Sequence, residues 1–302
     1  SGVVTFFDGA GSLGTASLDG SGVATLTTSS LAPGVHPIRA EYGGVTSFLP
    51  SASSTIDQSV EANASLLVLA SSSNPSPLGA SVTFSATVLV PNVATTATGR
   101  VTFKAGGATL GTSTLAAGTA VATFSTAALA AGTHYITAEY EGDLYHVPSA
   151  GSLVQSITRA VTTTSLVSSS NPAVFGQPVT FTATVTSGVA GRTPTGSVTF
   201  LDGATTIGGA TLDASGAVTL TVPAFVVGPH ALTAVYAGDA NFVPSTSPAL
   251  SQVVDRAATT TTVVSGSNPS LLGRSVTLTA TVTPVSPGAG TPGGTVTFKD
   301  GA

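Results

Sequence analysis

The chain has 302 residues, a net charge of −5 and only 7% charged residues. Its eight lysines and arginines form no basic patch, which argues against a nucleic-acid partner. Cysteine is absent, so disulfides and thiolate metal sites are excluded, and no apolar run approaches the roughly 18 residues that span a bilayer.

One segment recurs along the chain with a period of about 97 residues. Ser-Asn-Pro stands at 73–75, 170–172 and 267–269, and Val-Thr-Phe at 4–6, 101–103, 198–200 and 296–298. A period of this length indicates an array of like domains and not a solenoid whose repeats share one core. The predicted domains are two incomplete ones at the ends and two complete ones between them: 1–60, 61–158, 159–255 and 256–302.

The copy from 161 to 254 predicts about seven short strands. The first covers 161–168, is rich in threonine and β-branched residues, and is ended by Asn171-Pro172. Residues 178–186 alternate strictly between apolar residues and threonine, which is the pattern of a half-buried strand. Turn signals such as Asp202-Gly203 separate the strands that follow. These are expected at 196–201, 205–212, 218–222, 230–236 and 249–254.

No segment has helical periodicity over three turns, so the predicted fold is all-β. Seven short alternating strands with turns between them favour tandem immunoglobulin-like β-sandwiches of about seven strands each. In the end domains, residues 1–60 should carry the third strand onward and residues 256–302 the first three strands. The third strand thus occurs at both ends, which favours an excerpt of a longer array over head-to-tail strand complementation between molecules.

Three motifs recur in fixed order. They are Ser-Asn-Pro before the alternating strand 179–185, Val-Thr-Phe-x-Asp-Gly at 198–203, and Tyr-x-Gly-Asp-x-x-Phe-x-Pro-Ser at 236–245. With them the whole chain resembles the bacterial immunoglobulin-like domain repeat family. The departures are mild: Lys104-Ala105-Gly106 replaces the Asp-Gly turn, and residues 42–45 lose the aspartate. The resemblance implies tandem modules of large secreted or surface-attached bacterial proteins, with a stalk, adhesin or filament role and no defined ligand.

Histidine recurs at the start of one strand, at His36, His134 and His230. A catalytic histidine needs a nucleophile or an acid fixed beside it, and a metal-binding one needs further ligands. No such cluster recurs, so we expect these histidines to cap the end of the core. His146 stands where Phe48 and Phe242 stand, and we expect it to be a partly exposed replacement.

Tyrosine recurs at the end of the same strand, at Tyr42, Tyr140 and Tyr236. A sugar-stacking role is one alternative. The commoner use in sandwiches is a tyrosine at the edge of the core whose hydroxyl bonds to the backbone, and we expect that use here.

Carboxylates near the predicted junctions raise the alternative of calcium between domains. They are Asp57, Glu61, Asp143, Asp239 and Asp255. Calcium takes six to eight oxygens, usually with several carboxylates converging. The junctions 58–64, 155–161 and 252–258 carry one, none and one carboxylate, so solvated turn and linker residues are the favoured interpretation.

Glutamine recurs on the last strand, at Gln58, Gln155 and Gln252. The threonine-rich first strands at 162–164 and 259–262 should lie near it. Some surface adhesins form Thr–Gln ester cross-links between such strands, but the chemistry needs an adjacent acid and base that the sequence does not place. A Lys–Asn isopeptide bond is disfavoured because Phe7 and Leu201 occupy the positions of Lys104 and Lys299.

The sequence thus predicts no catalytic, cofactor-binding or metal-binding residue. It favours a structural, non-enzymatic array at the cell surface or outside the cell, forming a stalk or filament. Its expected partners are neighbouring Ig-like repeats of the same or an identical chain, through lateral or head-to-tail self-assembly. One alternative is an adhesin that binds glycans or protein, for which Leu144-Tyr145-His146 is the one added loop cluster. The other is a spacer in a large secreted enzyme.

Overall fold

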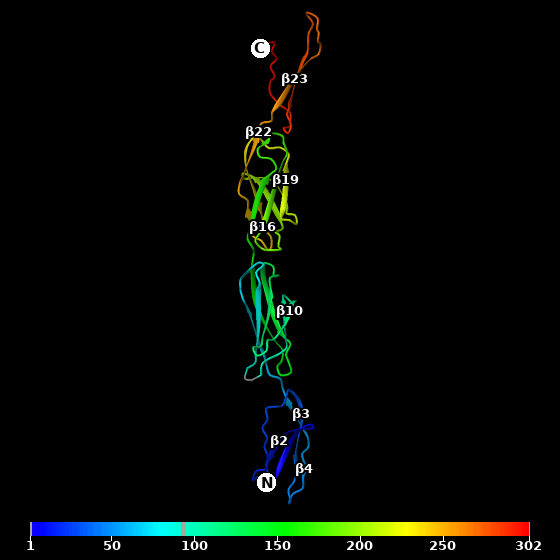
Figure 1. Ribbon diagram of the computed structural model, residues 1–302, viewed down its shortest axis with the longest axis vertical. Helices are drawn as coiled ribbons and strands as arrows, with labels where there is room; N and C mark the ends of the chain where they lie inside the picture. The colour runs from blue at the N-terminus through cyan, green and yellow to red at the C-terminus, as the bar shows by residue number, and fades with distance from the viewer. Residues whose placement is uncertain (1, 92–94, 302) are drawn as a thin grey trace. The chain divides into compact units, whose positions relative to one another are not determined.

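The computed structural model describes residues 2–91 and 95–301, and these contain strands and no helix (Figure 1). Ser1 and Ala302, the outermost residues of the predicted end domains, lie outside the described residues. The chain divides into two compact units. The first comprises 1–75, 81–127 and 133–156, and the second comprises 76–80, 128–132 and 157–302. The four domain boundaries expected from the repeats stay a prediction.

The second unit contains a two-sheet sandwich. Its smaller sheet is antiparallel in the order β14 (Thr162–Ser168), β16 (Val179–Ser187) and β19 (Ala217–Val222). The larger sheet has the order β15 (Ala173–Val174), β22 (Leu250–Asp255), β20 (Gly228–Tyr236), β17 (Ser197–Asp202) and β18 (Thr205–Thr211), and β21 (Ser245–Thr246) pairs with β20. The chain passes from β18 across to β19 and back to β20, a Greek-key connection.

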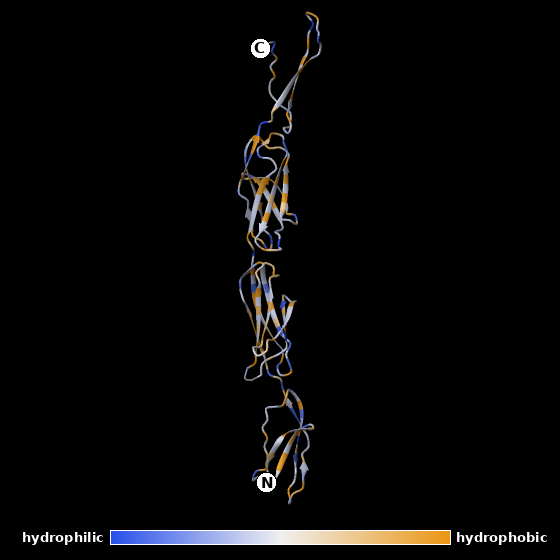
Figure 2. Ribbon diagram, in the orientation of Figure 1, coloured by the Kyte–Doolittle hydropathy of each residue, from blue (hydrophilic) through white to orange (hydrophobic). Residues whose placement is uncertain are grey.

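The alternation of the sequence builds the core of this sandwich. On β16, every second side chain from Val179 to Val185 is at most 1% exposed, and the threonines between them face outward. Facing residues from the larger sheet complete the core, among them Phe200, Leu232 and Tyr236, each at most 1% exposed. Figure 2 shows the resulting hydrophobic bands along the strands. Gly203, with φ +58°, forms the tight turn between β17 and β18 that Asp202-Gly203 predicts.

Residues 66–158 repeat this arrangement. One sheet has the order β11 (Val121–Thr126), β8 (Val82–Leu89) and β6 (Leu66–Ser71). The other has the order β10 (Ala108–Thr114), β9 (Arg100–Ala105), β12 (Gly132–Tyr140), β13 (Ser149–Thr158) and β7 (Ser76–Pro77). The prediction of all-β, tandem immunoglobulin-like sandwiches is therefore confirmed.

Each end of the chain contributes one sheet. Near the N-terminus, β1 (Val3–Asp8) pairs with β2 (Gly11–Ser17) and β3 (Gly34–Tyr42), and β3 also pairs with β4 (Ser51–Ala52) and β5 (Ile56–Val60). Near the C-terminus, β23 (Thr259–Ser265) pairs with β24 (Leu278–Pro284). Among the described residues no helix is long and apolar enough to cross a membrane.

Two expected strands do not form in these end sheets. Residues 296–298, the third strand expected in the last domain, and residues 23–28, the counterpart of β19, are not strands. The cause is the lack of neighbours. β17, the counterpart of 296–298, pairs with β18 on one side and β20 on the other, and β19 pairs with β16. Without such partners the backbone amides find no ladder, and Phe298 stays 49% exposed.

Phe181 offers a test of the core. Its side chain is 0% exposed and its ring meets that of Phe225 edge to face, with centroids 5.7 Å apart. We expect Phe181→Ala to cost about 3–5 kcal/mol because it leaves a cavity. Hydrogen exchange of amides in β16 and β20 should accelerate accordingly. The control is Val226→Ala, 74% exposed, which should change stability by at most about 0.5 kcal/mol. Equal effects of the two changes would contradict the packing.

Candidate functional site

Recurring polar residues tie the first and last strands of each sandwich together. Gln252 on β22 is 0% exposed, and its Oε1 accepts a hydrogen bond of 2.7 Å from the Ser168 hydroxyl. Its Nε2 donates to the carbonyl oxygens of Ser170 at 2.9 Å and of Val253 at 3.0 Å. We call Ser168, Ser170, Asn171 and Gln252, with the backbone of 251–253, the terminal-strand clamp.

In the clamp, the side-chain amide of Asn171 makes the hydrogen bonds that a backbone residue would make. Its Nδ2 donates to the Ser251 carbonyl at 2.7 Å, and its Oδ1 accepts from the Val253 amide at 3.0 Å. Proline follows it, which has no amide hydrogen and ends β14. The asparagine side chain therefore provides the donor and the acceptor that the last strand needs. This accounts for Ser-Asn-Pro in the two copies that have a last strand. The Asn-Pro bonds 74–75, 171–172 and 268–269 are cis.

The clamp has the same geometry in the preceding copy. The Ser71 hydroxyl donates to Gln155 Oε1 at 2.6 Å, and Gln155 Nε2 donates to the Ser73 carbonyl at 2.9 Å. Asn74 donates to the Val154 carbonyl at 2.6 Å and accepts from the Ser156 amide at 2.9 Å. Gln155, like Gln252, is 0% exposed. A buried amide with all its hydrogen-bonding atoms satisfied fixes the register of the last strand.

Two-residue strands extend each clamp. β15 pairs with β22 in parallel, with Ala173 opposite Val254, and β7 pairs in the same way with β13. The Phe175 amide donates to the Asp255 carbonyl at 2.8 Å. The segment that enters the sandwich and the strand that leaves it therefore run side by side in the same direction.

The first strand lies near the glutamine, as expected, but its threonines bond elsewhere. The hydroxyl at Gln252 belongs to Ser168, whereas Thr162 and Thr164 both bond to Ser245, each at 2.7 Å. Residues 259–262 are exposed, and Gln58 is exposed with its amide donating to the Ser59 carbonyl at 2.8 Å. The clamp is thus noncovalent, built from serine, asparagine and glutamine. The recurrence of Ser at 71 and 168, 84 residues before each glutamine, is the signal that identifies this partner.

Two of the recurring histidines, His36 and His230, have an acid partner that the sequence analysis missed. His230 Nδ1 lies 2.6 Å from Asp202 Oδ2 and its Nε2 lies 2.8 Å from the Val226 carbonyl oxygen. His36 lies likewise between Asp8 and Ala32, at 2.6 Å from each. Both neighbours of each ring are acceptors, so the ring satisfies both only as the doubly protonated imidazolium. His134 is half-buried, and Ala105 stands where Asp202 stands. The sequence signal for this pairing is the Asp-Gly turn, whose aspartate stands 28 residues before His36 and before His230.

Asp143 and Asp239 organise the loop after the tyrosine strand. Asp239 accepts four hydrogen bonds: from the amide and hydroxyl of Thr195 at 2.9 and 2.7 Å, and from the amides of Asn241 and Phe242 at 2.7 and 2.9 Å. Burial alone would raise the pKa of Asp239, but these bonds outweigh it and hold the pKa below its usual value. Asp143 is bonded likewise to Thr98, Tyr145 and His146.

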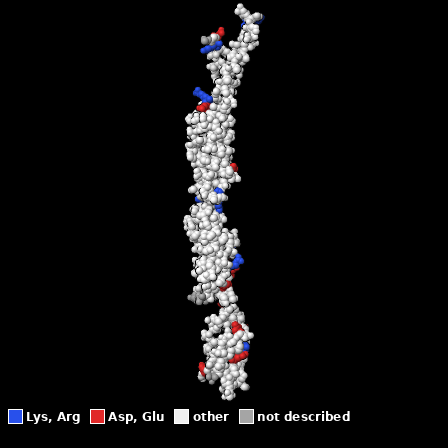
Figure 3. Space-filling view, viewed as in Figure 1, with Lys and Arg blue, Asp and Glu red and all other residues white. Residues whose placement is uncertain are grey.

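The carboxylates do not gather at a metal site. Asp57, Glu61 and Asp255 are exposed. Within residues 2–91 and 95–301, no group of three or more histidine, aspartate or glutamate side chains is placed to hold a metal ion. Charged side chains are sparse on the face shown in Figure 3. Interdomain calcium therefore finds no ligand set in the part of the chain described.

The tyrosines lie in the core. Tyr140 and Tyr236 are 1% and 0% exposed, and their hydroxyls lie near the backbone of Thr98 and of Thr195, with no partner at full hydrogen-bond geometry. Burial first, and then the charge of Asp239, raises the pKa of Tyr236 to about 12. Asp143 acts in the same way on Tyr140, whose pKa is also about 12. Full burial rules out sugar stacking at these two rings. Tyr42 is half-buried.

The prediction that His146 is partly exposed is wrong. It is 1% exposed rather than partly exposed, with Nδ1 2.8 Å from Asp143 Oδ1 and Nε2 3.0 Å from Thr95 Oγ1. The ring fills the core position that Phe242 fills in the next copy, where Phe242 is 2% exposed. The neighbouring Leu144 and Tyr145 are 62% and 44% exposed.

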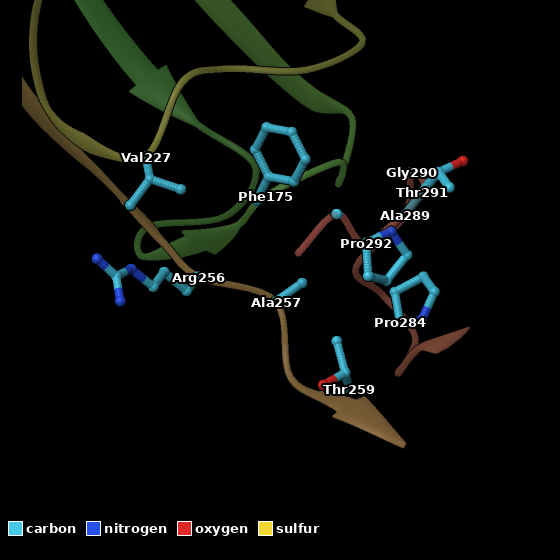
Figure 4. Close-up of a pocket in the computed structure, with 11 residues that line it drawn as sticks. Phe175, Val227, Arg256, Ala257, Thr259, Pro284, Ala289, Gly290, Thr291 and Pro292 are labelled. Atoms are coloured by element: carbon cyan, nitrogen blue, oxygen red, sulfur yellow. The ribbon is translucent and has the colours of Figure 1, made fainter. Parts of the chain in front are cut away.

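An apolar pocket of about 380 Å³ lies at the end of β22 in the second unit (Figure 4). Phe175, Pro284 and Pro292 line the pocket, and the guanidinium of Arg256 points away from the two prolines. Arg256 is the one ionisable residue of the lining. A specific small-molecule site usually has several convergent polar groups, so we assign this pocket no ligand.

The repeats of this chain match a known domain family. The sequence model of the bacterial Ig-like domain (group 3) matches residues 1–61, 69–158 and 166–255. The chain belongs to this family. Each match contains one copy of the third strand, with Val-Thr-Phe at 4–6, 101–103 or 198–200. The two later matches each contain a complete terminal-strand clamp from Ser71 or Ser168 onward.

Solved structures with similarity to this bacterial Ig-like chain come from varied proteins. Fibronectin(III)-like modules of Clostridium thermocellum CbhA are 18% identical, with TM-score 0.26, over 63% of this chain and 95% of theirs. The Yersinia pseudotuberculosis adhesin InvE is 16% identical, with TM-score 0.37, over 62% and 58%. The ectodomain of mouse nectin-like molecule 4 is 12% identical, with TM-score 0.29, over 84% and 90%.

A comparison with curated proteins finds no match. The structural similarities are too weak to indicate function, so the family assignment rests on the sequence match.

The clamp glutamines allow a matched test. Gln252→Ala removes a 0% exposed side chain and leaves the Ser168 hydroxyl and the Ser170 carbonyl without their partner. We expect a loss of stability of about 3 kcal/mol, from the cavity and the unpaired groups together. Gln58→Ala changes the same repeat position where the side chain is exposed, and should cost less than about 0.5 kcal/mol. Hydrogen exchange of the two segments measures both, and a neutral Gln252→Ala would contradict the clamp.

The histidine–aspartate pairs predict a pH dependence. Burial alone would lower the pKa of His230, but the Val226 carbonyl and the Asp202 carboxylate outweigh it and raise the pKa above 6.5. The stabilisation is therefore complete below pH 6.5 and is lost as pH rises through the raised value. In NMR titrations, Asp202→Asn should lower the pKa of His230 and leave that of His36, also raised, unchanged. An unchanged pKa of His230 would show that the pair does not interact.

Proposed function

We propose that this chain is a structural, non-enzymatic part of an extracellular array whose bacterial Ig-like domains form a cell-surface stalk or filament. The proposed domains are 1–60, 61–158, 159–255 and 256–302. The observation that carries the proposal is the terminal-strand clamp, which recurs with the same bonds in both complete copies. The recurring polar residues thus serve the framework of each domain. Bacterial Ig-like domains are typically not catalytic, in agreement with this role.

The direction of the clamped strands suits a chain under tension. β15 and β22 are parallel, and the chain enters before β15 and leaves after β22. A pull on the two ends therefore slides these segments past one another along their length. All bonds of the clamp bear the load together, whereas an antiparallel pair pulled from one end opens bond by bond. A domain in a surface stalk needs this resistance, since anchoring and adhesion both put the chain under force.

The low charge of the surface favours contacts between copies. Only 21 of 302 residues are charged. Soluble monomers usually carry a larger share, with both signs interspersed. Outward threonine and serine side chains cover much of the sheets, as in the pair Thr180 and Thr221, 2.9 Å apart. This surface supports lateral packing of identical chains, with neighbouring Ig-like repeats as partners.

An adhesive role is the second candidate, favoured by one loop. Leu144, Tyr145 and Val147 are 62%, 44% and 40% exposed, side by side in a loop that Asp143 holds in shape. The counterparts of the first two in the next copy are Ala240 and Asn241, which are smaller or more polar. A surface that binds a protein or a glycan would use such residues of a single copy. A glycan array that gives no signal would argue against the adhesive role.

Single-molecule pulling tests the structural role. Stretching the whole chain should give two strong unfolding events, each releasing roughly 300 Å of chain at about 3.6 Å per residue. Asn171→Ala should lower the unfolding force of one event and leave the other unchanged, because the clamp of 61–158 is intact. The control is Val218→Ala on β19, 6% exposed and outside the clamp. Both changes lower equilibrium stability by about 1–3 kcal/mol, but only the first should lower the force.

Equal forces for Asn171→Ala and the unaltered chain would overturn the load-bearing role. The location is tested separately, by antibodies against 159–255 applied to intact cells of the organism that carries the gene. Labelling only after the cells are permeabilised would contradict an extracellular array.

A further inference from the structure

Three side chains of one copy lie in a row that the framework does not require. Asp143 Oδ1 lies 2.8 Å from His146 Nδ1, and His146 Nε2 lies 3.0 Å from Thr95 Oγ1. The histidine ring is 1% exposed, whereas Thr95 is exposed. An exposed threonine is therefore hydrogen-bonded to a buried imidazole, which in turn is bonded to a carboxylate.

The hydrogen bonds assign the protons of the row. Asp143 also accepts bonds from the amides of Tyr145 and His146 and from Thr98. Burial alone would raise the pKa of Asp143, but the bonds from the His146 ring, from Thr98 and from the Tyr145 amide outweigh it and hold the pKa well below its usual value. The ionised carboxylate can only accept, so Nδ1 of His146 carries the proton. In the neutral ring the lone pair is on Nε2, and the Thr95 hydroxyl then donates to it.

This row is a departure of one copy from the repeat. Phe242 occupies the position of His146 in the next copy and Phe48 occupies it in the first. Arg192 occupies the position of Thr95, 97 residues further along the chain. The loop fold needs only the aspartate, because Asp239 shapes the same loop beside a phenylalanine. A core phenylalanine would fill the space without burying a polar ring.

We propose that Thr95 is an activated nucleophile, with His146 as its general base and Asp143 as the residue that orients the base, and that it accepts acyl groups from activated esters. A hydroxyl, an imidazole and a carboxylate in this order are the groups that acyl transfer uses, and they are recognised by geometry and not by sequence order. The proposal is independent of the structural role of the array, since it concerns a group that one copy adds.

The acyl transfer uses only the groups in the row and the ester. As Thr95 Oγ forms a bond to the acyl carbon, its proton passes to His146 Nε2. The bond between the acyl carbon and the leaving oxygen breaks, and the leaving alcohol or phenol departs with the electron pair. The proton on Nε2 then passes to the leaving group or to solvent, which restores the neutral ring. The product is an ester of Thr95.

The test uses the full chain and 4-nitrophenyl acetate. Release of 4-nitrophenol, intact mass and peptide mapping should show one acetyl group on Thr95, formed faster than on the exposed Thr123 of β11. His146→Phe, which places the residue found at 242, should slow acetylation of Thr95 by about 100-fold or more, the usual contribution of a general base. Thr95→Ser should keep the reaction and Thr95→Ala should abolish the adduct.

Thermal melts show whether each variant stays folded, and the Thr95→Ser protein keeps the proposal testable if Thr95→Ala does not fold. Acetylation of Thr95 no faster than that of Thr123, or unchanged in folded His146→Phe, would overturn the proposal and leave His146 as a core residue whose nitrogens are merely satisfied.

Discussion

The tie between the entering segment and the last strand is the interaction on which each sandwich depends. A two-sheet domain has its chain ends in different places of the fold, and the first strand belongs to one sheet while the last belongs to the other. Ser168 at the end of β14 reaches Gln252 on β22, so the clamp connects the two sheets as well as the two ends. The isolated glutamine amide is costly to bury, and only a complete set of partners makes it favourable. That requirement explains why serine, asparagine and glutamine recur together across 84 residues of sequence.

Much of the fold follows from local pattern. The alternation of β16 predicts which of its side chains are buried, and the Asp-Gly turn predicts the hairpin of β17 and β18, because both depend on neighbouring residues alone. The strands expected at 296–298 and 23–28 show the limit of this reasoning. A single alternating segment has the propensity for a strand, but its backbone hydrogen bonds lie on other strands, and without them the segment stays irregular.

The site could be predicted only in part, because its contacts join residues far apart in the sequence. The sequence correctly places the last-strand glutamine near the first strand but does not identify Ser168 as its partner, since side-chain composition does not show which hydroxyl points across to β22. The sequence likewise shows both His230 and the Asp202 turn, but it does not show that they pair. Their pairing depends on the register of β17 with β20. Registers of this kind are fixed by the sandwich as a whole.

Repetition makes it possible to separate framework from chemistry within one molecule. A residue that occurs in every copy with the same partners, such as Gln155 and Gln252, is explained by the fold that the copies share. A residue that breaks the pattern needs another explanation, and the explanation must account for its cost. His146 replaces an aromatic hydrocarbon by a ring with two polar nitrogens in a fully buried position, and it stays there only because Asp143 and Thr95 satisfy both. Asp239 shapes the same loop beside Phe242, so the aspartate serves the loop in both copies, and in this copy it also bonds to the buried histidine ring.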